Sequence, residues 1–172
     1  MKNGLDANQL VIDRISNGIV VDHMPAGMAL AVLKILGAEK QEFLNKGNII
    51  AVAINVRTLK RPEQRKDVLK IQNFKMQKID EVRLGLLVPG STVNIIQDYS
   101  ILEKKQITLP RYIEGLNCPS SSCITNEREN TKKTFDIVYL ENQKGYLRCR
   151  YCEEAFILES VTTSMRNTNF QT

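Results

Sequence analysis

The stretch NGIVVDHMPAGMALAVLKIL, residues 17–36, contains the change of periodicity on which the fold prediction depends. Asn17-Gly18 is a strong two-residue turn signal. The apolar residues around it predict two short extended segments within residues 10–24, one on each side of the turn. The chain therefore enters its first helix from a strand.

The second half of this stretch predicts a helix. Pro25 suits the first turn of a helix, and the apolar run that follows extends to Leu36, where Gly37 ends it. Lys34 is its single polar side chain, so we expect the helix to be covered on more than one side. A helix buried on a sheet within one subunit is the simplest interpretation.

Downstream segments repeat the pattern of strands and helices. The further expected elements are strands at 48–56 and 67–72 with a charged, exposed loop between them, a helix at 79–87, and a strand at 92–97. Residues 99–107 either extend the sheet or lead out of it. Strand, helix, strand, strand, helix, strand is the order of a ferredoxin-like βαββαβ domain, an α+β fold with both helices on one sheet face.

A second unit is expected after Leu109-Pro110. Few apolar residues occur there before Phe135, and all four cysteines lie there. Segments 135–140 and 146–151 predict a β-hairpin with a five-residue loop. We therefore predict domains at 1–108 and 109–172, the second small and mainly β.

The composition is that of an ordinary globular protein: 172 residues with 24 Lys and Arg, 19 Asp and Glu, one His and no Trp. The longest apolar run, Met28–Leu33, is far too short to span a bilayer, and the polar start lacks a signal-peptide core. We therefore expect a cytoplasmic protein without membrane association.

The charge is unevenly distributed along the chain. Residues 1–110 hold 16 Lys and Arg against 11 Asp and Glu, whereas residues 111–172 hold eight of each. An anionic ligand is expected at the first part.

The four cysteines form two close pairs, Cys118-Pro-Ser-Ser-Ser-Cys123 and Cys149-Arg-Tyr-Cys152, separated by 25 residues. A reducing compartment disfavours disulfides, and two turns that each supply two thiolates suit tetrahedral Zn²⁺. We predict one structural zinc ion per chain, on which the second unit depends for folding. Cys149 and Cys152 alone would suit a redox pair, but such a pair opens a helix after a strand and leaves the other two cysteines unexplained.

Residues suited to binding an anion are scattered along the first unit. Asp22-His23 ends one predicted strand, and Lys66, Lys70 and Lys104 lie on or beside others. Adjacent strands bring such residues together on one face, although each residue alone is more typical of a solvated surface. The chain has no Gly-rich phosphate loop, no nucleophile motif and no paired carboxylates suited to catalysis.

In order and spacing, these motifs resemble the regulatory chain of aspartate carbamoyltransferase. The resemblance rests on residues 17–25, 65–73, 92–99, 109–110, 118–125 and 149–152. It extends from about Leu10 to Phe156, and this chain departs from the family in a longer segment at 39–64 and in the residues after Phe156. Arg14 stands where the family often has a small residue.

The resemblance implies an allosteric domain that binds nucleoside triphosphates and a zinc domain that docks on the catalytic chain. CTP, with UTP as a further candidate, would favour a low-activity state and ATP a high-activity state. The residues implied around base and ribose are Ile12, Asp13, Ile15, Val20, Asp22 and His23, with Lys70 and Tyr99 nearby. Asn94 and Lys104 would face the phosphates, and Lys66 would serve a second, metal-linked nucleotide.

These observations predict a non-catalytic subunit in pyrimidine biosynthesis, with the catalytic chain and a second regulatory chain as partners and no nucleic acid. The main alternative is a basic zinc-ribbon protein that binds nucleic acid. Against it, residues 111–172 carry no surplus of positive charge and no aromatic residues interleaved with a basic stripe. A stand-alone thiol oxidoreductase, the third interpretation, requires an exposed cysteine of low pKa.

Overall fold

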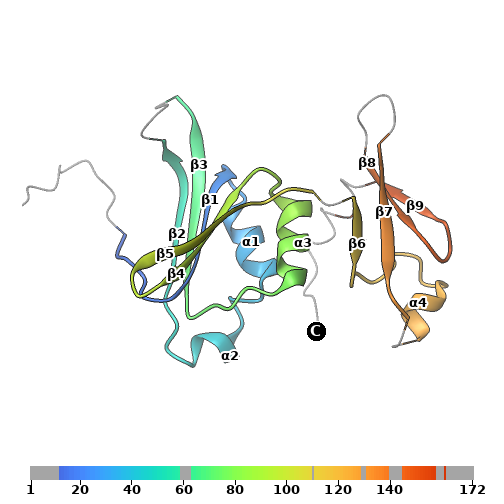
Figure 1. Cartoon of the computed structure of the whole chain (residues 1–172), viewed down its shortest axis with the longest axis horizontal. Coiled ribbons are helices and arrows are strands. Elements are labelled where there is room, and N and C mark those ends of the chain that lie inside the picture. The colour runs from blue at the N-terminus through green and yellow to red at the C-terminus, as the bar shows by residue number, and fades with distance from the viewer. Residues whose placement is uncertain are drawn as a thin grey trace, which may run out of the picture.

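Two antiparallel sheets and a few helices make up the chain in this computed structural model, which describes residues 12–58, 63–109, 111–128, 131–139, 145–157 and 161 (Figure 1). In the first unit the elements are β1 (Gly18–Pro25), α1 (Ala29–Ile35), α2 (Gln41–Leu44), β2 (Ile50–Arg57), β3 (Arg65–Gln72), α3 (Lys78–Leu87), β4 (Thr92–Gln97) and β5 (Ser100–Gln106). In the second they are β6 (Tyr112–Glu114), α4 (Ile124–Glu127), β7 (Thr134–Tyr139), β8 (Gly145–Cys149) and β9 (Ala155–Ile157).

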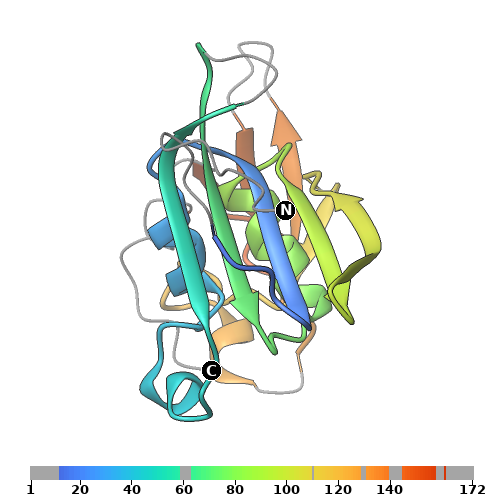
Figure 2. The same cartoon turned by 90° about the vertical axis from the view of Figure 1, so that its left-hand side faces the viewer.

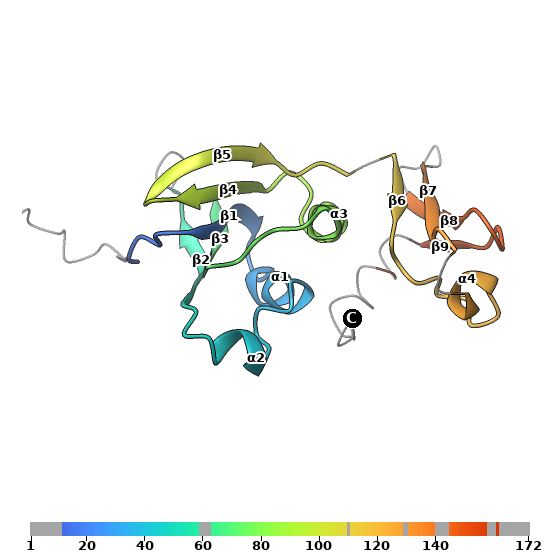
Figure 3. The same ribbon diagram turned by 60° about the horizontal axis from the view of Figure 1, so that its bottom comes forward.

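The first sheet has the strand order β2-β3-β1-β4-β5, with every neighbouring pair antiparallel. Helices α1 and α3 lie on one of its faces (Figure 3). The opposite face carries no helix from the described part of the chain, and it is turned toward the viewer in Figure 2. This arrangement confirms the predicted α+β, ferredoxin-like fold. It also shows that residues 100–106 extend the sheet as an added edge strand.

The helix-covered face of the sheet holds the core of the first unit. Its buried apolar side chains include Ile19, Val21, Leu69, Ile71 and Val93 from the strands and Ala29, Val32, Ile35 and Leu84 from the helices. Because side chains alternate along a strand, the intervening residues point to the helix-free face. That alternation places Val20 of β1, Lys70 of β3 and Asn94 of β4 on one surface.

Some elements differ from their predicted extent. Residues 12–17 form no strand, and the first two residues of the predicted segment 10–24 lie outside the described part of the chain. Helix α1 begins only at Ala29, because Gly27 has a φ of 89° and the buried Asp67 carboxylate accepts the Ala29 backbone N–H at 2.8 Å. The short helix α2 was not predicted. Leu30 of α1 is 59% exposed, so α1 is covered less completely than expected.

The second unit is a four-stranded sheet in the order β6-β7-β8-β9, and it contains the predicted hairpin. The loop of that hairpin, residues 140–144, lies outside the described residues. Helix α3 of the first unit adjoins β6 (Figures 1 and 3). A Cβ added to Gly115, directly after β6, would lie 3.2 Å from Ile79 Cδ1 of α3, so the two units are in contact there.

Within the described ranges, the structure contains no helix of sufficient length and apolarity to cross a membrane.

Candidate functional site

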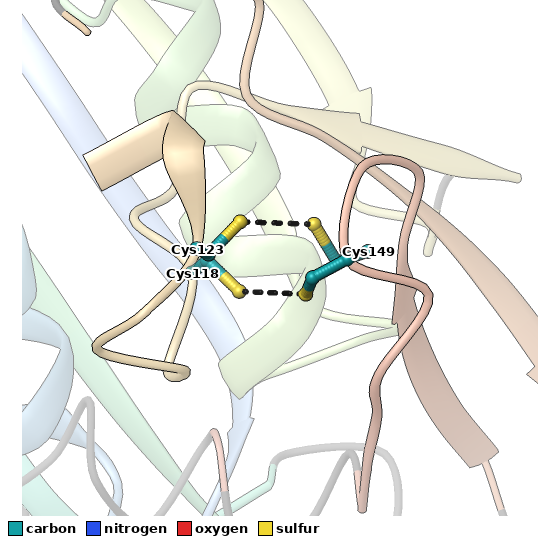
Figure 4. A group of neighbouring side chains, drawn as sticks. Cys118, Cys123 and Cys149 are labelled. Carbon is teal, nitrogen blue, oxygen red and sulfur yellow. Dashed lines mark hydrogen bonds between the residues drawn. The ribbon is translucent and has the colours of Figure 1, made fainter. Parts of the chain in front are cut away.

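The four cysteine side chains converge at one end of the second unit (Figure 4). Cys118 and Cys123 come from the loop between β6 and α4, Cys149 ends β8, and Cys152 lies in the turn before β9. Cys118, Cys123 and Cys149 are buried, Cys152 is half-buried, and all four are free thiols. Residues far apart in the chain therefore form a single sulfur cluster.

The spacing of the sulfur atoms fits a tetrahedral metal ion. Four ligands at a Zn–S distance of about 2.3 Å place neighbouring sulfurs about 3.8 Å apart. The Sγ atoms of Cys118 and Cys152 are 3.7 Å apart, those of Cys123 and Cys149 are 3.8 Å apart, and all four lie within 4.8 Å of one another. The cluster is thus preformed for four-thiolate coordination.

Backbone amides surround the sulfurs with hydrogen-bond donors. The Sγ atoms of Cys118, Cys123 and Cys152 each accept a bond from the amide two residues further on. Cys123 Sγ forms a further hydrogen bond with the Thr125 hydroxyl at 3.1 Å, and this bond together with the one from the Thr125 amide lowers the pKa of the Cys123 thiol to about 7. Burial instead raises the pKa values of Cys118 and Cys152. A cation among the sulfurs would remove that cost of burial, because it favours the thiolate form.

Two side chains fix the turns that carry the cysteines. Asn126 Oδ1 accepts the Cys118 N–H at 3.1 Å, and Asn126 Nδ2 donates to the carbonyls of Cys118 and Ser120 at 2.9 and 2.8 Å. Arg150 donates to Asp136 at 2.6 Å from Nη2 and 3.0 Å from Nε, and its guanidinium lies 5.6 Å from the centre of the Tyr112 ring. The Arg150 hydrogen bonds lower the pKa of the Asp136 carboxyl. Both cysteine loops are therefore held by contacts outside the sulfur cluster.

Polar residues form a transverse row on the helix-free face of the first sheet. Val20 of β1 pairs with Lys70 of β3 on one side and with Asn94 of β4 on the other. Asn94 in turn pairs with Lys104 of β5. Lys105, the next residue, forms an ion pair at 2.5 Å with Glu81 of α3 on the covered face, so Lys104 points to the helix-free face.

A pocket of about 340 Å³ lies beside this row, on the side of the β4–β5 turn. Its lining residues are Arg14, Ile15, Val20, Lys70, Ile96, Tyr99 and Ile101. Four of these are predicted site residues, namely Ile15, Val20, Lys70 and Tyr99. Tyr99 is 62% exposed and adopts a φ of 61°, and Asp98 before it has a φ of 49°. These two residues form the turn between β4 and β5, and a two-residue hairpin turn of type I′ requires a positive φ at both positions.

The segment before β1 is held over the sheet by hydrogen bonds. Lys70 Nζ donates to the carbonyls of Ile12 and Asp13 at 3.1 and 3.0 Å. The Tyr99 N–H donates to the Ser16 carbonyl at 3.0 Å. The predicted residues Ile12 and Asp13 thus lie next to Lys70 through their backbone, and the pocket wall is fixed at two points.

The structure separates other predicted site residues from the pocket. Lys66 Nζ lies 2.7 Å from Asp22 Oδ1, and His23 Nδ1 lies 3.3 Å from Asp22 Oδ2, at the far end of β1. Asn94 lies between these residues and the pocket, and its buried Oδ1 has no hydrogen-bond partner within the described ranges. The face therefore carries an apolar pocket, a central amide and lysine, and a separate charged cluster.

Sequence reasoning missed Arg14, Ile96 and Ile101 as pocket residues. Ile96 lies two residues after Asn94, so strand alternation contained a signal for it. Ile101 pairs with Ile96 across the hairpin. Arg14 lies in a segment without regular structure, whose position depends on Lys70, and no periodicity pointed to it.

Comparison with known families agrees with both parts of the structure. The model for the aspartate carbamoyltransferase regulatory chain, allosteric domain, matches residues 10–108, and that for the metal binding domain of the same chain matches residues 111–162. The chain belongs to this family. The regulatory chain of Ignicoccus hospitalis is 40% identical over 148 residues, which cover 85% of this chain and 90% of the relative. That of Saccharolobus solfataricus is 38% identical over 147 residues, covering 85% and 87%.

Membership confirms the predicted family and its non-catalytic character. An aspartate carbamoyltransferase regulatory chain is a regulatory subunit, consisting of an allosteric domain and a metal-binding domain, and it associates with the catalytic chain. The sulfur cluster lies in the part matched by the metal-binding model, and the helix-free face lies in the part matched by the allosteric model.

Proposed function

We propose that this aspartate carbamoyltransferase regulatory chain senses CTP and ATP, and also UTP, on the helix-free sheet face, with one zinc ion in its cysteine cluster. Residues 1–108 form the sensing domain, and residues 109–172 form the domain that docks on the catalytic chain. Two copies associate as a dimer in the cytoplasm. CTP favours the low-activity state and ATP the high-activity state, each through a difference in affinity for the two states.

The transverse row carries the nucleotide proposal. A nucleoside triphosphate needs an apolar surface for the base and cationic groups for the phosphates. The pocket beside the row supplies the first, and Lys104 of the row supplies a cation for the second. Asn94 supports this orientation of the nucleotide, because its buried Oδ1 has no hydrogen-bond partner in the described part of the chain and suits a ribose hydroxyl or a bound water. Asp22, His23 and Lys66 form a second polar group on the same face, suited to a metal-linked nucleotide.

Calorimetric titration of CTP and ATP into the full chain assembled with its catalytic chain tests this proposal. Lys104→Ala should weaken both triphosphates by roughly 10- to 150-fold, the usual worth of a charge-assisted contact. Lys105→Ala is the matched control, because its side chain faces α3 on the other side of the strand. Equal affinities in the wild type and both variants would refute the site.

Zinc is the ion that the sulfur cluster suits best. When bound, it would cross-link the two cysteine loops and supply folding free energy to the second unit. The amide and hydroxyl donors around the sulfurs stabilise the thiolate form that such an ion requires.

Metal analysis combined with thiol titration tests the zinc site. The native chain should contain one zinc ion, and Cys123→Ala should lose it, unfold mainly residues 109–172 and abolish docking while nucleotide binding survives. Ser122→Ala, an exposed neighbour in the same loop, should retain the metal. Zinc-free native protein with two disulfides would contradict the assignment.

A further inference from the structure

Arg14 occupies the wall of the sheet-face pocket. It is exposed, and its guanidinium makes no hydrogen bond or ion pair with any residue that the structure describes. The lining of the pocket contains no carboxylate. A guanidinium group with no partner among the described residues and no carboxylate in the lining around it is available to a ligand.

Hydrogen bonds on both sides of Arg14 hold its backbone, so the position from which its side chain extends is fixed. Lys70 binds the carbonyl of Asp13, directly before Arg14, at 3.0 Å. Two residues later, the Ser16 carbonyl accepts the Tyr99 N–H at 3.0 Å. Arg14 is therefore anchored from β3 and from the β4–β5 turn, and this pre-organisation reduces the entropy cost of a contact to a bound molecule.

Arg14 lies in the apolar part of the proposed nucleotide site. Ile15, Ile96 and Ile101 make the pocket apolar, and the Tyr99 ring offers an aromatic surface. Lys104, the cation proposed for the phosphates, is not among the lining residues. If a nucleotide binds with its base on the apolar surface, Arg14 meets the edge of the base.

We propose that Arg14 selects among nucleotides by their base, favouring guanine over adenine. This inference rests on the proposed nucleotide site. A guanidinium presents hydrogen-bond donors in a planar fork, which matches the N7 and O6 acceptors of guanine. Adenine has N7 but carries an amino group in place of O6. That amino donor would face an N–H donor of the guanidinium, so the second hydrogen bond cannot form. ATP still binds through its phosphates, but without the bidentate contact.

The test is calorimetric titration of GTP and ATP into the full regulatory chain assembled with its catalytic chain. The wild type should bind GTP about 5- to 150-fold more tightly than ATP, the range expected for one bidentate base contact. Arg14→Ala should abolish the preference and leave ATP affinity within about twofold of the wild type. Arg14→Lys keeps the charge but not the fork, so it should also lose the preference. Lys75→Ala, an exposed cation outside the pocket, is the control and should keep it.

The remaining outcomes separate this inference from the proposed function. Equal GTP and ATP affinities in the wild type would overturn the role of Arg14 and leave the nucleotide site standing. An equal loss for both triphosphates in Arg14→Ala would overturn it as well, because Arg14 would then contact phosphate. Titration with guanosine and adenosine checks for such a phosphate contact. These nucleosides lack phosphates, so a preference for guanosine that depends on Arg14 can come only from a contact to the base. Absence of binding by any nucleotide would refute the site itself.

Discussion

Asp67→Asn should destabilise the first unit although it changes only one side-chain atom. Asp67 is fully buried, and its two carboxylate oxygens accept backbone N–H groups from different elements. Oδ2 accepts from Ala29 at the start of α1, and Oδ1 accepts from Asn55 in the bulge of β2, both at 2.8 Å. An amide retains one acceptor and turns an NH₂ group toward the second N–H, leaving a buried donor unsatisfied.

The expected loss in the free energy of unfolding is about 1–3 kcal/mol, the cost of one buried unsatisfied polar group. Urea unfolding of the zinc-loaded chain measures it, and hydrogen exchange should show faster exchange of the Ala29 or the Asn55 amide. Asp98→Asn, the same chemical change at an exposed turn position, should stay within about 0.5 kcal/mol of the wild type. Equal stability of wild type and Asp67→Asn, with unchanged exchange at both amides, would show that these contacts contribute little.

Two further changes address the contact between the units and the cluster beside the cysteines. Gly115→Ala should weaken the effect of CTP and ATP on aspartate saturation without changing nucleotide affinity, because the added Cβ would press on Ile79 of α3 at 3.2 Å and Gly115 has a φ of 86°; unchanged aspartate curves would contradict this. In carbon-13 NMR, the Asp136 carboxyl should titrate below its ordinary pKa, and Arg150→Gln should move it upward. Since the folded-state pKa is depressed, the stabilisation is complete above the unfolded pKa of about 3.9 and is lost as pH falls through the folded value. Titration of Asp136 in the ordinary carboxyl range would rule out the pair.

Local pattern was sufficient to predict the alternating strands and the sulfur cluster. Val20, Asn94 and Lys70 share a face because strand periodicity is two, and paired cysteines at short spacing converge once their turns meet. Both features depend on a few neighbouring residues, which is the kind of information a single sequence contains.

Features that depend on tertiary contacts were not predictable. The start of α1 depends on Asp67, a residue 38 positions away whose buried carboxylate binds the Ala29 N–H. The bulge between Ala53 and Val56, with Asn55 at a φ of 58°, interrupts the pairing of β2 with β3 without a glycine to mark it. The pocket position of Arg14 likewise depends on hydrogen bonds to β3 and to the β4–β5 turn.

The outer strand β5 bears on how the protein behaves when concentrated. A sheet border exposes unpaired backbone groups and can recruit strands from other molecules, leading to aggregation. Here a bulge at Ile95/Ile96 breaks the regular register, and the adjacent Lys104 and Lys105 project to opposite faces. An incoming strand would meet the exposed positive charge of Lys104 on one face, the ion pair of Lys105 with Glu81 on the other, and an irregular backbone. The exposed Ile101 and Leu102 can thus lie at this border while the strand resists fibre-like growth.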